Sequence, residues 1–235
     1  MPAPDDRPPL ADPGDPYAAT LEEVTRQADH LPAAALDEDA QAMITAEIEA
    51  ARRHAAALEE PPPVTLISFD AHPGNFLKEA GSGRAVLVDL EKARYGAAGF
   101  DLAHATLYTS TTWDVATHSE PDQAAIADFY DTYLEGLPRD LAAAQRPHLM
   151  ALRRLMWLWS ITWCAKWRVE SAGERRADKH KAESAEDWSA ENSDAALIEH
   201  VRGRVEHYLA PETVERVRAD WRGRNPLTDR LGALA

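Results

Sequence analysis

One stretch of the chain, residues 64–91, has the pattern of β-strands, and helical patterns flank it on both sides. Apolar and β-branched residues alternate there with turn signals, a Pro-Gly pair at 73–74 and a Gly-Ser-Gly run at 81–83, which predict short strands and a hairpin from Lys78 to Arg84. A chain with one strand-forming region cannot build a large sheet. We therefore expect an α+β, mainly α fold in which short strands form an insert among helices.

Helical patterns account for most of the remaining chain. We expect a flexible arm at residues 1–14, which is rich in Pro, Asp and Gly, and one domain at residues 15–235. Asp15 followed by Pro16 is a typical helix start, because aspartate caps the first turn and proline is accepted at the first helical position. The apolar spacing predicts helices at residues 15–31, 37–58, 100–108, 123–134, 147–169, 195–208 and 211–221. The charged segment 170–194 is poor in aliphatic residues, which predicts a solvated loop or a partly formed helix.

The chain is acidic, with 40 Asp and Glu residues against 25 Lys and Arg residues and a formal net charge of −15 at pH 7. A charge of this sign repels phosphate backbones and anionic membranes, so we exclude nucleic acid and membranes as partners. It favours a cationic small-molecule substrate, such as an amine or an amino sugar, although part of the charge serves only to solvate the surface. The lone Cys164 cannot form an internal disulfide, and we find no signal peptide and no run long enough to span a bilayer, so we expect a cytoplasmic protein.

Two aspartates and one asparagine lie at the ends of strands in the strand-forming stretch. Asp70 ends an apolar strand, Asn75 follows the Pro-Gly bend, and Asp89 ends the next apolar strand. Side chains at neighbouring strand ends can converge on one site, and loops at such rims commonly carry function. An amide and a carboxylate suit Mg²⁺, which takes few protein ligands alongside water and substrate phosphates. Asp70 would then be available as the base that accepts a hydroxyl proton in phosphoryl transfer.

Three motifs resemble those of the aminoglycoside phosphotransferase and choline kinase family, small-molecule kinases with a protein-kinase-like fold. Ser-Phe-Asp-Ala-His-Pro-Gly-Asn at 68–75 is similar to that family's His-x-Asp-x-x-x-x-Asn catalytic loop. Asp-Leu-Glu at 89–91 looks like its metal-binding strand, and Gly-Phe-Asp-Leu-Ala at 99–103 looks like the start of the helix that follows. Helices on both sides of these motifs also match the family's helical lobe.

The resemblance implies roles for individual residues. Asp70 would be the catalytic base, Asn75 and Asp89 would hold Mg²⁺ and through it ATP, and Glu91 would be a further metal or substrate ligand. Asp101 would be a buried anchor that bonds to the backbone of the catalytic loop. Ser68 and His72 would support the structure of the loop.

The chain departs from this family in two respects. Ser68 stands where the family has a histidine, which is mostly a structural residue, so this substitution alone does not exclude activity. The family's β-rich N-terminal lobe, which supplies a phosphate-covering loop and a lysine, has no counterpart before residue 64, where only the arm and two helices are predicted. We therefore expect only the C-terminal lobe of a kinase-like fold, with the nucleotide lobe supplied separately or through self-association.

Two function classes compete. The leading interpretation is an ATP-dependent, Mg²⁺-dependent phosphotransferase that moves the γ-phosphoryl group to a hydroxyl of a small molecule. The alternative is a truncated or degenerate kinase-like lobe that binds a ligand or partner without turnover. A third interpretation is a metal-dependent hydrolase, because the side chains of Asp70, His72, Asp89, Glu91 and His104 are of types that bind Zn²⁺ or Mn²⁺, but no recognised ligand spacing supports it.

The aromatic residues divide between packing and binding. Trp157, Trp163 and Trp167 are spaced as on the core face of a helix, which predicts packing. Trp113 lies in a predicted loop near the site, so we expect it to be the tryptophan that contacts substrate. His104 follows Asp101 by one helical turn and is predicted to be a semi-buried histidine whose polar atoms are satisfied.

Overall fold

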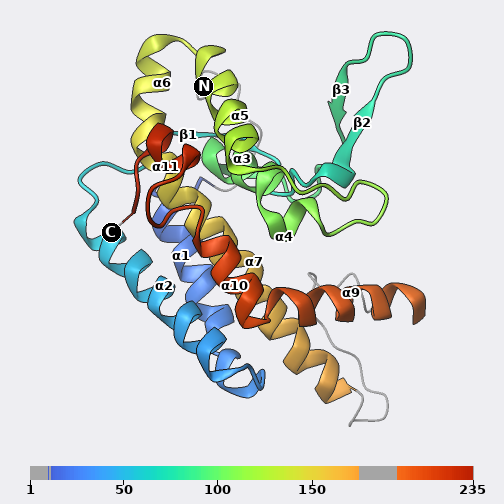
Figure 1. The fold of residues 1–235 in the computed structure, drawn as a ribbon. Coiled ribbons are helices and arrows are strands. Elements are labelled where there is room, and N and C mark those ends of the chain that lie inside the picture. Colours follow the sequence, from blue (N-terminus) through green and yellow to red (C-terminus); the bar gives the residue numbers. More distant parts are fainter. Residues whose placement is uncertain (1–9, 11, 175–194, 235) are drawn as a thin grey trace.

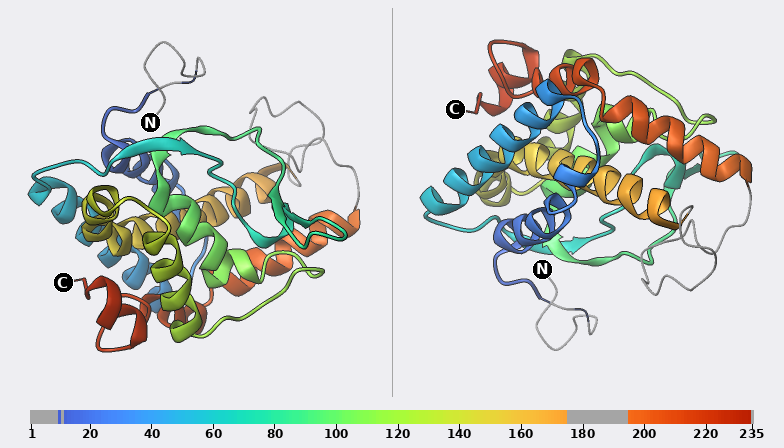
Figure 2. Two further views of the ribbon diagram at one scale, coloured as in Figure 1. Left: turned by 90° about the horizontal axis from the view of Figure 1, so that it is seen from above. Right: turned by 90° about the horizontal axis from the view of Figure 1, so that it is seen from below.

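The computed structural model describes residue 10, residues 12–174 and residues 195–234. Helices dominate these residues, and two small antiparallel sheets lie beside the helical body (Figure 1 and Figure 2). The helices are α1 (Pro16–Ala28), α2 (Glu38–Ala57), α3 (Ala98–Thr106), α4 (Tyr108–Thr111), α5 (Gln123–Glu135), α6 (Arg139–Gln145), α7 (Leu149–Glu174), α9 (Ala195–Tyr208), α10 (Pro211–Arg218) and α11 (Pro226–Leu231). The 3₁₀ turns are η2 (Leu31–Ala33), η3 (Pro73–Asn75) and η4 (Arg146–His148). The strands are β1 (Val64–Ile67), β2 (Phe76–Lys78), β3 (Ala85–Leu87) and β4 (Arg94–Ala97).

The long helix α7 forms the centre of the molecule and packs against α1, α2, α3 and α9. Every residue from 149 to 158 is buried, the charged Arg153 and Arg154 included, so this part of the helix is covered on all sides. Trp157 and Trp167 are buried and Trp163 packs on the core, which confirms the predicted packing role of these side chains. In the described parts of the chain, no helix combines the length and the apolar character needed to cross a bilayer.

The helix boundaries follow mostly from local sequence. Asp15 caps α1 as predicted, since its side chain accepts hydrogen bonds from the backbone N–H groups of Tyr17 at 2.9 Å and Ala18 at 3.1 Å. The limits of α2, α5 and α9 agree with the prediction to within one residue.

Three helices, α4, α6 and α11, were not predicted, because each is too short to show a clear apolar period. The N-terminus of α11 is closed by a capping box in which Asn225 and Thr228 exchange hydrogen bonds. The central helix α7 also extends past the predicted end at residue 169 to Glu174. Of the predicted loop, residues 175–194 lie outside the described residues, as do residues 1–9 and 11 of the predicted arm.

The strands form two separate two-stranded sheets, in agreement with the expectation of short strands and no large sheet. Strand β1 pairs with β4, with Val64 opposite Ala97, and β2 pairs with β3, with Phe76 opposite Leu87. The loop between β1 and β2 contains a left-handed residue, Phe69, and the turn η3, which change the direction of the chain. As a result β2 pairs with β3 and not with β1. The predicted hairpin is confirmed, and it projects from the helical body in Figure 1.

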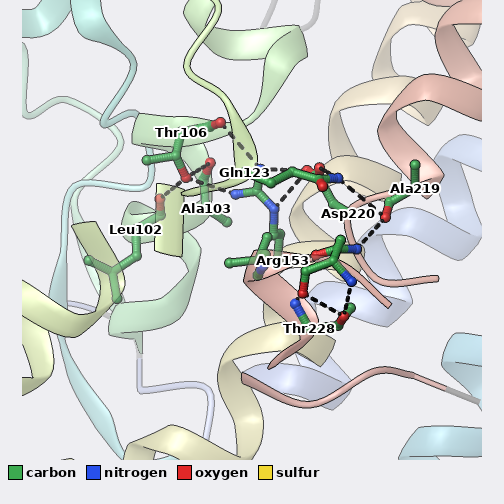
Figure 3. A network of polar contacts seen from close by, with 10 residues as sticks. Leu102, Ala103, Thr106, Gln123, Arg153, Ala219, Asp220 and Thr228 are labelled. Carbon is green, nitrogen blue, oxygen red and sulfur yellow. Dashed lines mark hydrogen bonds and ion pairs between the residues drawn. The ribbon is translucent and has the colours of Figure 1, made fainter. Parts of the chain in front are cut away.

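A buried ion pair fixes α3 to the core. Arg153, fully buried on α7, donates to Asp220 Oδ2 through Nε at 3.0 Å and Nη2 at 2.6 Å. The same guanidinium donates to the Thr106 hydroxyl at 2.7 Å and to the Thr106 carbonyl at 3.2 Å, at the end of α3 (Figure 3). Because every partner in this network is hydrogen-bonded, it locks α3 between α7 and the segment after α10.

Candidate active site

The loop after β1 is held by one carboxylate of α3. Asp101, in the first turn of α3, accepts hydrogen bonds from the backbone N–H groups of Ser68 and Phe69, each at 2.8 Å. Phe69 has a left-handed backbone with φ of 57°, a conformation that costs a bulky residue about 1–3 kcal/mol. Burial raises the pKa of Asp101, and the two backbone hydrogen bonds oppose that shift. The carboxylate thus stabilises a loop conformation that the chain would not adopt by itself.

The ring of Phe69 is clamped on three sides. It meets the rings of Phe100 and Trp159 edge to face, with centroids 5.7 Å and 5.2 Å away. The Arg94 guanidinium lies 3.4 Å from its centroid, a cation–π contact. Glu23 of α1 accepts hydrogen bonds from Arg94 at 2.7 Å and from Trp159 Nε1 at 2.9 Å, so α1 holds two sides of this clamp.

Asp70 follows Phe69 directly and lies against a cation. Its backbone N–H donates to the Ser68 hydroxyl at 3.2 Å, so Ser68 contacts the loop as a supporting residue would. Its carboxylate accepts a hydrogen bond from Lys92 Nζ at 3.1 Å. Only 13% of the Asp70 side chain is exposed, so Lys92 covers part of the candidate base. Sequence reasoning missed this lysine, although it follows directly after Asp-Leu-Glu.

Asn75 and Asp89 lie at the base of the hairpin. The Asn75 side chain is buried and its Nδ2 donates to the Asp70 carbonyl at 2.9 Å, which leaves the amide oxygen as the atom able to face a cation. The Val88 N–H donates to the Asn75 carbonyl at 2.9 Å and extends the β2–β3 pairing by one position. Asp89, the next residue, is exposed and has a left-handed φ of 58°. The pairing therefore brings the backbones of Asn75 and Asp89 together.

Position 74 of the Pro-Gly bend has too little room for a side chain, so it requires glycine. His72 Nδ1 accepts a hydrogen bond from the Gly74 N–H at 3.1 Å, so His72 closes the turn. A Cβ added at Gly74 would lie 2.7 Å from His72 Cε1 and 3.3 Å from Asp114 Oδ2. Asp114, from the loop after α4, therefore reaches the Asp70 loop, and no local signal in the sequence indicates this contact.

Charges from three segments act on the imidazole of His72. Burial lowers the pKa of His72, while the carboxylates of Asp70, Asp114 and Asp89 raise it and the ammonium of Lys92 lowers it. These charged groups thus lie within electrostatic range of one side chain. Glu91 is exposed in the turn that precedes β4, and its proposed ligand role remains a prediction.

His104 lies beneath the loop and differs from the prediction. Its side chain is buried rather than semi-buried, and its Nδ1 has no hydrogen-bond partner. Burial lowers its pKa to about 4, so the imidazole is neutral at physiological pH. His104 is buried because it lies on the face of α3 that packs against the rest of the protein. Its ring centroid is 6.2 Å from that of His72.

Trp113 packs against the helices on one side of the loop that carries Asp114. Its ring meets those of Trp163 on α7 and Tyr208 on α9, with centroids 6.0 Å and 6.2 Å away. Its carbonyl lies 2.8 Å from His200 Nε2. The tryptophan is half-buried in this aromatic cluster, and a contact with substrate remains a prediction.

The donor types at the loop fit magnesium better than zinc. Among the described residues, no group of three or more His, Cys, Asp or Glu side chains is arranged to hold a metal ion, so the hydrolase interpretation has no assembled ligand set there. The amide oxygen of Asn75 and the carboxylate of Asp89 are hard oxygen donors, the type that Mg²⁺ takes in small number beside substrate phosphates.

A family comparison matches the part of the chain that builds this loop. The family model described as the phosphotransferase enzyme family matches residues 3–145, which is more than half of the chain. The chain belongs to this family. The match confirms the resemblance to aminoglycoside and choline kinase-like proteins, and the family implies phosphotransferase chemistry in general. The matched range of this phosphotransferase family member contains Asp70, Asn75, Asp89 and Asp101. A search of curated proteins found no match.

Proposed function

We propose that the protein is an ATP-dependent small-molecule O-phosphotransferase of the aminoglycoside or choline kinase type. The observation that carries this proposal is the Asp70 loop, because Asp101 and the Phe69 clamp hold its backbone in a strained conformation, and the Asn75 side chain bonds to the backbone carbonyl of Asp70 itself. Strain of this kind persists where the surrounding structure over-determines it, and it is concentrated at functional sites.

In this proposal Asp70 accepts the proton of the substrate hydroxyl as the hydroxyl oxygen attacks the γ-phosphorus of ATP. A new oxygen–phosphorus bond forms, the bond to the oxygen of ADP breaks, and the proton remains on Asp70 until solvent removes it. The protein mainly positions these groups, since phosphoryl transfer needs little covalent chemistry from a side chain. Ser68 and Asp101 contribute by holding the backbone on either side of Phe69.

Asn75 and Asp89 are the proposed ligands of Mg²⁺, with Glu91 as a further ligand of metal or substrate. A magnesium ion held there would neutralise charge on the phosphoryl oxygens. The hydrogen bond from Asn75 Nδ2 to the Asp70 carbonyl supports this assignment, because it couples the proposed metal ligand to the proposed base.

We propose a substrate that carries an amine, either an amino alcohol or an amino sugar. Asp114 supports this choice, since it adds a carboxylate beside Gly74 within electrostatic range of the site. The net charge of −15 also favours a cation over an anion. Trp113, next to Asp114 in the chain, is the proposed aromatic contact of the substrate.

We propose that a further protein surface covers the nucleotide at this site, as a kinase-like cleft requires. Among the described residues, α1 and α2 precede β1 and no strand does. Large apolar side chains are exposed in the segment that carries the candidate site: Leu66, Phe76, Leu77 and Leu90. Exposed apolar side chains favour contact with a further protein surface.

Calorimetric titration with ATP tests the proposed metal site. We expect the chain alone to bind ATP weakly in Mg²⁺ and not at all in EDTA, since Asn75, Asp89 and Glu91 are acceptors that attract phosphate only through a cation. Tight binding in EDTA would contradict the roles given to these three residues.

Turnover tests Asp70. With amino alcohols and amino sugars as acceptors, Asp70→Asn should lower the rate of ADP formation by about 10² to 10⁴ and leave MgATP affinity nearly unchanged. Asp128→Asn, the same change at an exposed position of α5, is the matched control and should keep the parent rate. Equal rates for Asp70→Asn and parent would exclude Asp70 as the base. If the protein binds MgATP but turns over none of these acceptors, the non-catalytic alternative would be favoured.

A further inference from the structure

The ion pair between Lys92 and Asp70 has no part in the mechanism proposed above. Lys92 Nζ lies 3.1 Å from Asp70 Oδ2. The ammonium therefore occupies a carboxylate oxygen to which a substrate hydroxyl would have to donate its proton. A transfer reaction that uses Asp70 as the base therefore needs Lys92 to move to another anion.

The local structure lets the ammonium move while its backbone stays fixed. Lys92 is the third residue of a turn closed by a hydrogen bond from the Ala93 N–H to the Leu90 carbonyl at 3.0 Å. Its side chain is 43% exposed, so the four-carbon stem has room to swing. An ammonium has three donors, and the contact with Asp70 uses one of them.

The other cations of residues 64–97 have different positions. Arg94 is committed to Glu23 and to the face of Phe69. Arg84 Nε lies 3.6 Å from Glu79 Oε2 on the hairpin, and Lys78 ends β2, where its Cε would lie 3.7 Å from a Cβ added at Gly83. Of the cationic side chains of residues 64–97, Lys92 is the one that binds the Asp70 carboxylate.

We propose that Lys92 is a phosphate-binding residue, whose ammonium passes from Asp70 to the terminal phosphoryl group of MgATP and thereby frees Asp70 to accept the proton. The inference rests on the proposed function. The exchange is favourable because a partly exposed ion pair is weak, whereas a terminal phosphoryl group offers several charged oxygens at once. Lys92 keeps its proton throughout, and the bonds made and broken are those of the transfer described above.

The ratio of ATP to ADP affinity tests this role, because ADP lacks the terminal group. By calorimetry in Mg²⁺, Lys92→Met should lower ATP affinity by about tenfold or more, the effect of one charge-assisted hydrogen bond, with ADP affinity unchanged. Lys92→Arg should retain most of the preference for ATP. Lys78→Met, which removes the same charge from the hairpin, is the control and should match the parent. A Lys92→Met protein with the parent ratio of ATP to ADP affinity would overturn the inference.

Magnesium tripolyphosphate separates this inference from the proposed function, since it lacks the nucleoside. Binding of tripolyphosphate that depends on Lys92, with no binding of ATP, would support the phosphate role and contradict the proposed use of ATP. Binding of MgATP that Lys92→Met leaves unchanged would overturn the role of Lys92 alone. A parent protein that binds neither ligand would overturn both.

Discussion

Acid should destabilise this protein through His104, which the fold buries beneath the candidate active site. The side chain is 9% exposed. Burial, with smaller contributions from the charges of His72 and Lys92, lowers its pKa from the ordinary 6.5 to about 4, against an opposing effect of Asp70 and the Phe69 backbone. The unfolded chain therefore binds this proton more readily than the folded protein does. The stability that neutral His104 preserves is complete above pH 6.5 and is lost as the pH falls towards 4.

The two pKa values set the size of the effect. Linkage between a folded pKa of about 4 and an unfolded pKa of 6.5 gives a loss of about 2 kcal/mol in the free energy of unfolding between pH 7 and pH 5. Typical domains have about 5–15 kcal/mol in total, so this loss is measurable and leaves the protein folded.

Urea denaturation at pH 7, 6 and 5 measures it, with parent and His104→Gln compared at each pH. Glutamine does not titrate, and the other histidines are present in both proteins, so their contributions cancel in the comparison. We expect the parent to lose about 2 kcal/mol more than His104→Gln between pH 7 and pH 5. Parallel pH dependences would refute the claim that His104 is held neutral by burial.

Two further predictions concern the parts that hold the loop. Asp101→Asn should cost about 1–3 kcal/mol, because an amide offers one neutral acceptor oxygen to two backbone donors, and should speed amide exchange at Ser68 and Phe69; unchanged exchange at both would contradict the anchoring role. Arg153→Met should cost about 3–5 kcal/mol by leaving Asp220 buried without its partner, whereas Arg153→Met with Asp220→Leu should recover most of that loss in urea denaturation; equal losses in the single and double variants would show that the pair itself, rather than the abandoned charge, stabilises the core.

Local signals predicted the elements that depend on local chemistry. The cap at Asp15 set the start of α1, and the Gly-Ser-Gly run set the turn between β2 and β3. The α-helical class followed from apolar spacing in the same way. The pairing of the strands could not be predicted from local sequence, because it depends on the direction that the loop around Phe69 gives the chain. The residue types do not indicate that a phenylalanine adopts a left-handed backbone there.

At the candidate site, spacing and the family resemblance indicated Asp70, Asn75, Asp89 and Asp101 but not the groups that surround them. Lys92 and Asp114 reach the loop from other segments, and their contacts exist only once the chain is folded. His104 was predicted to be satisfied because histidine usually is; its burial follows from which face of α3 meets the core, which a short helix does not reveal.

The contacts of Glu23 set a limit on how the loop can be transplanted. This residue of α1 lies 71 positions before Arg94 and 136 before Trp159, yet it binds both sides of the Phe69 clamp. A fragment that began at β1 would keep every motif residue and lose the group that orients two of the three supports of Phe69. The smallest unit that keeps the conformation of the Asp70 loop is therefore discontinuous in sequence, and a graft onto another scaffold must carry a carboxylate in the place of Glu23.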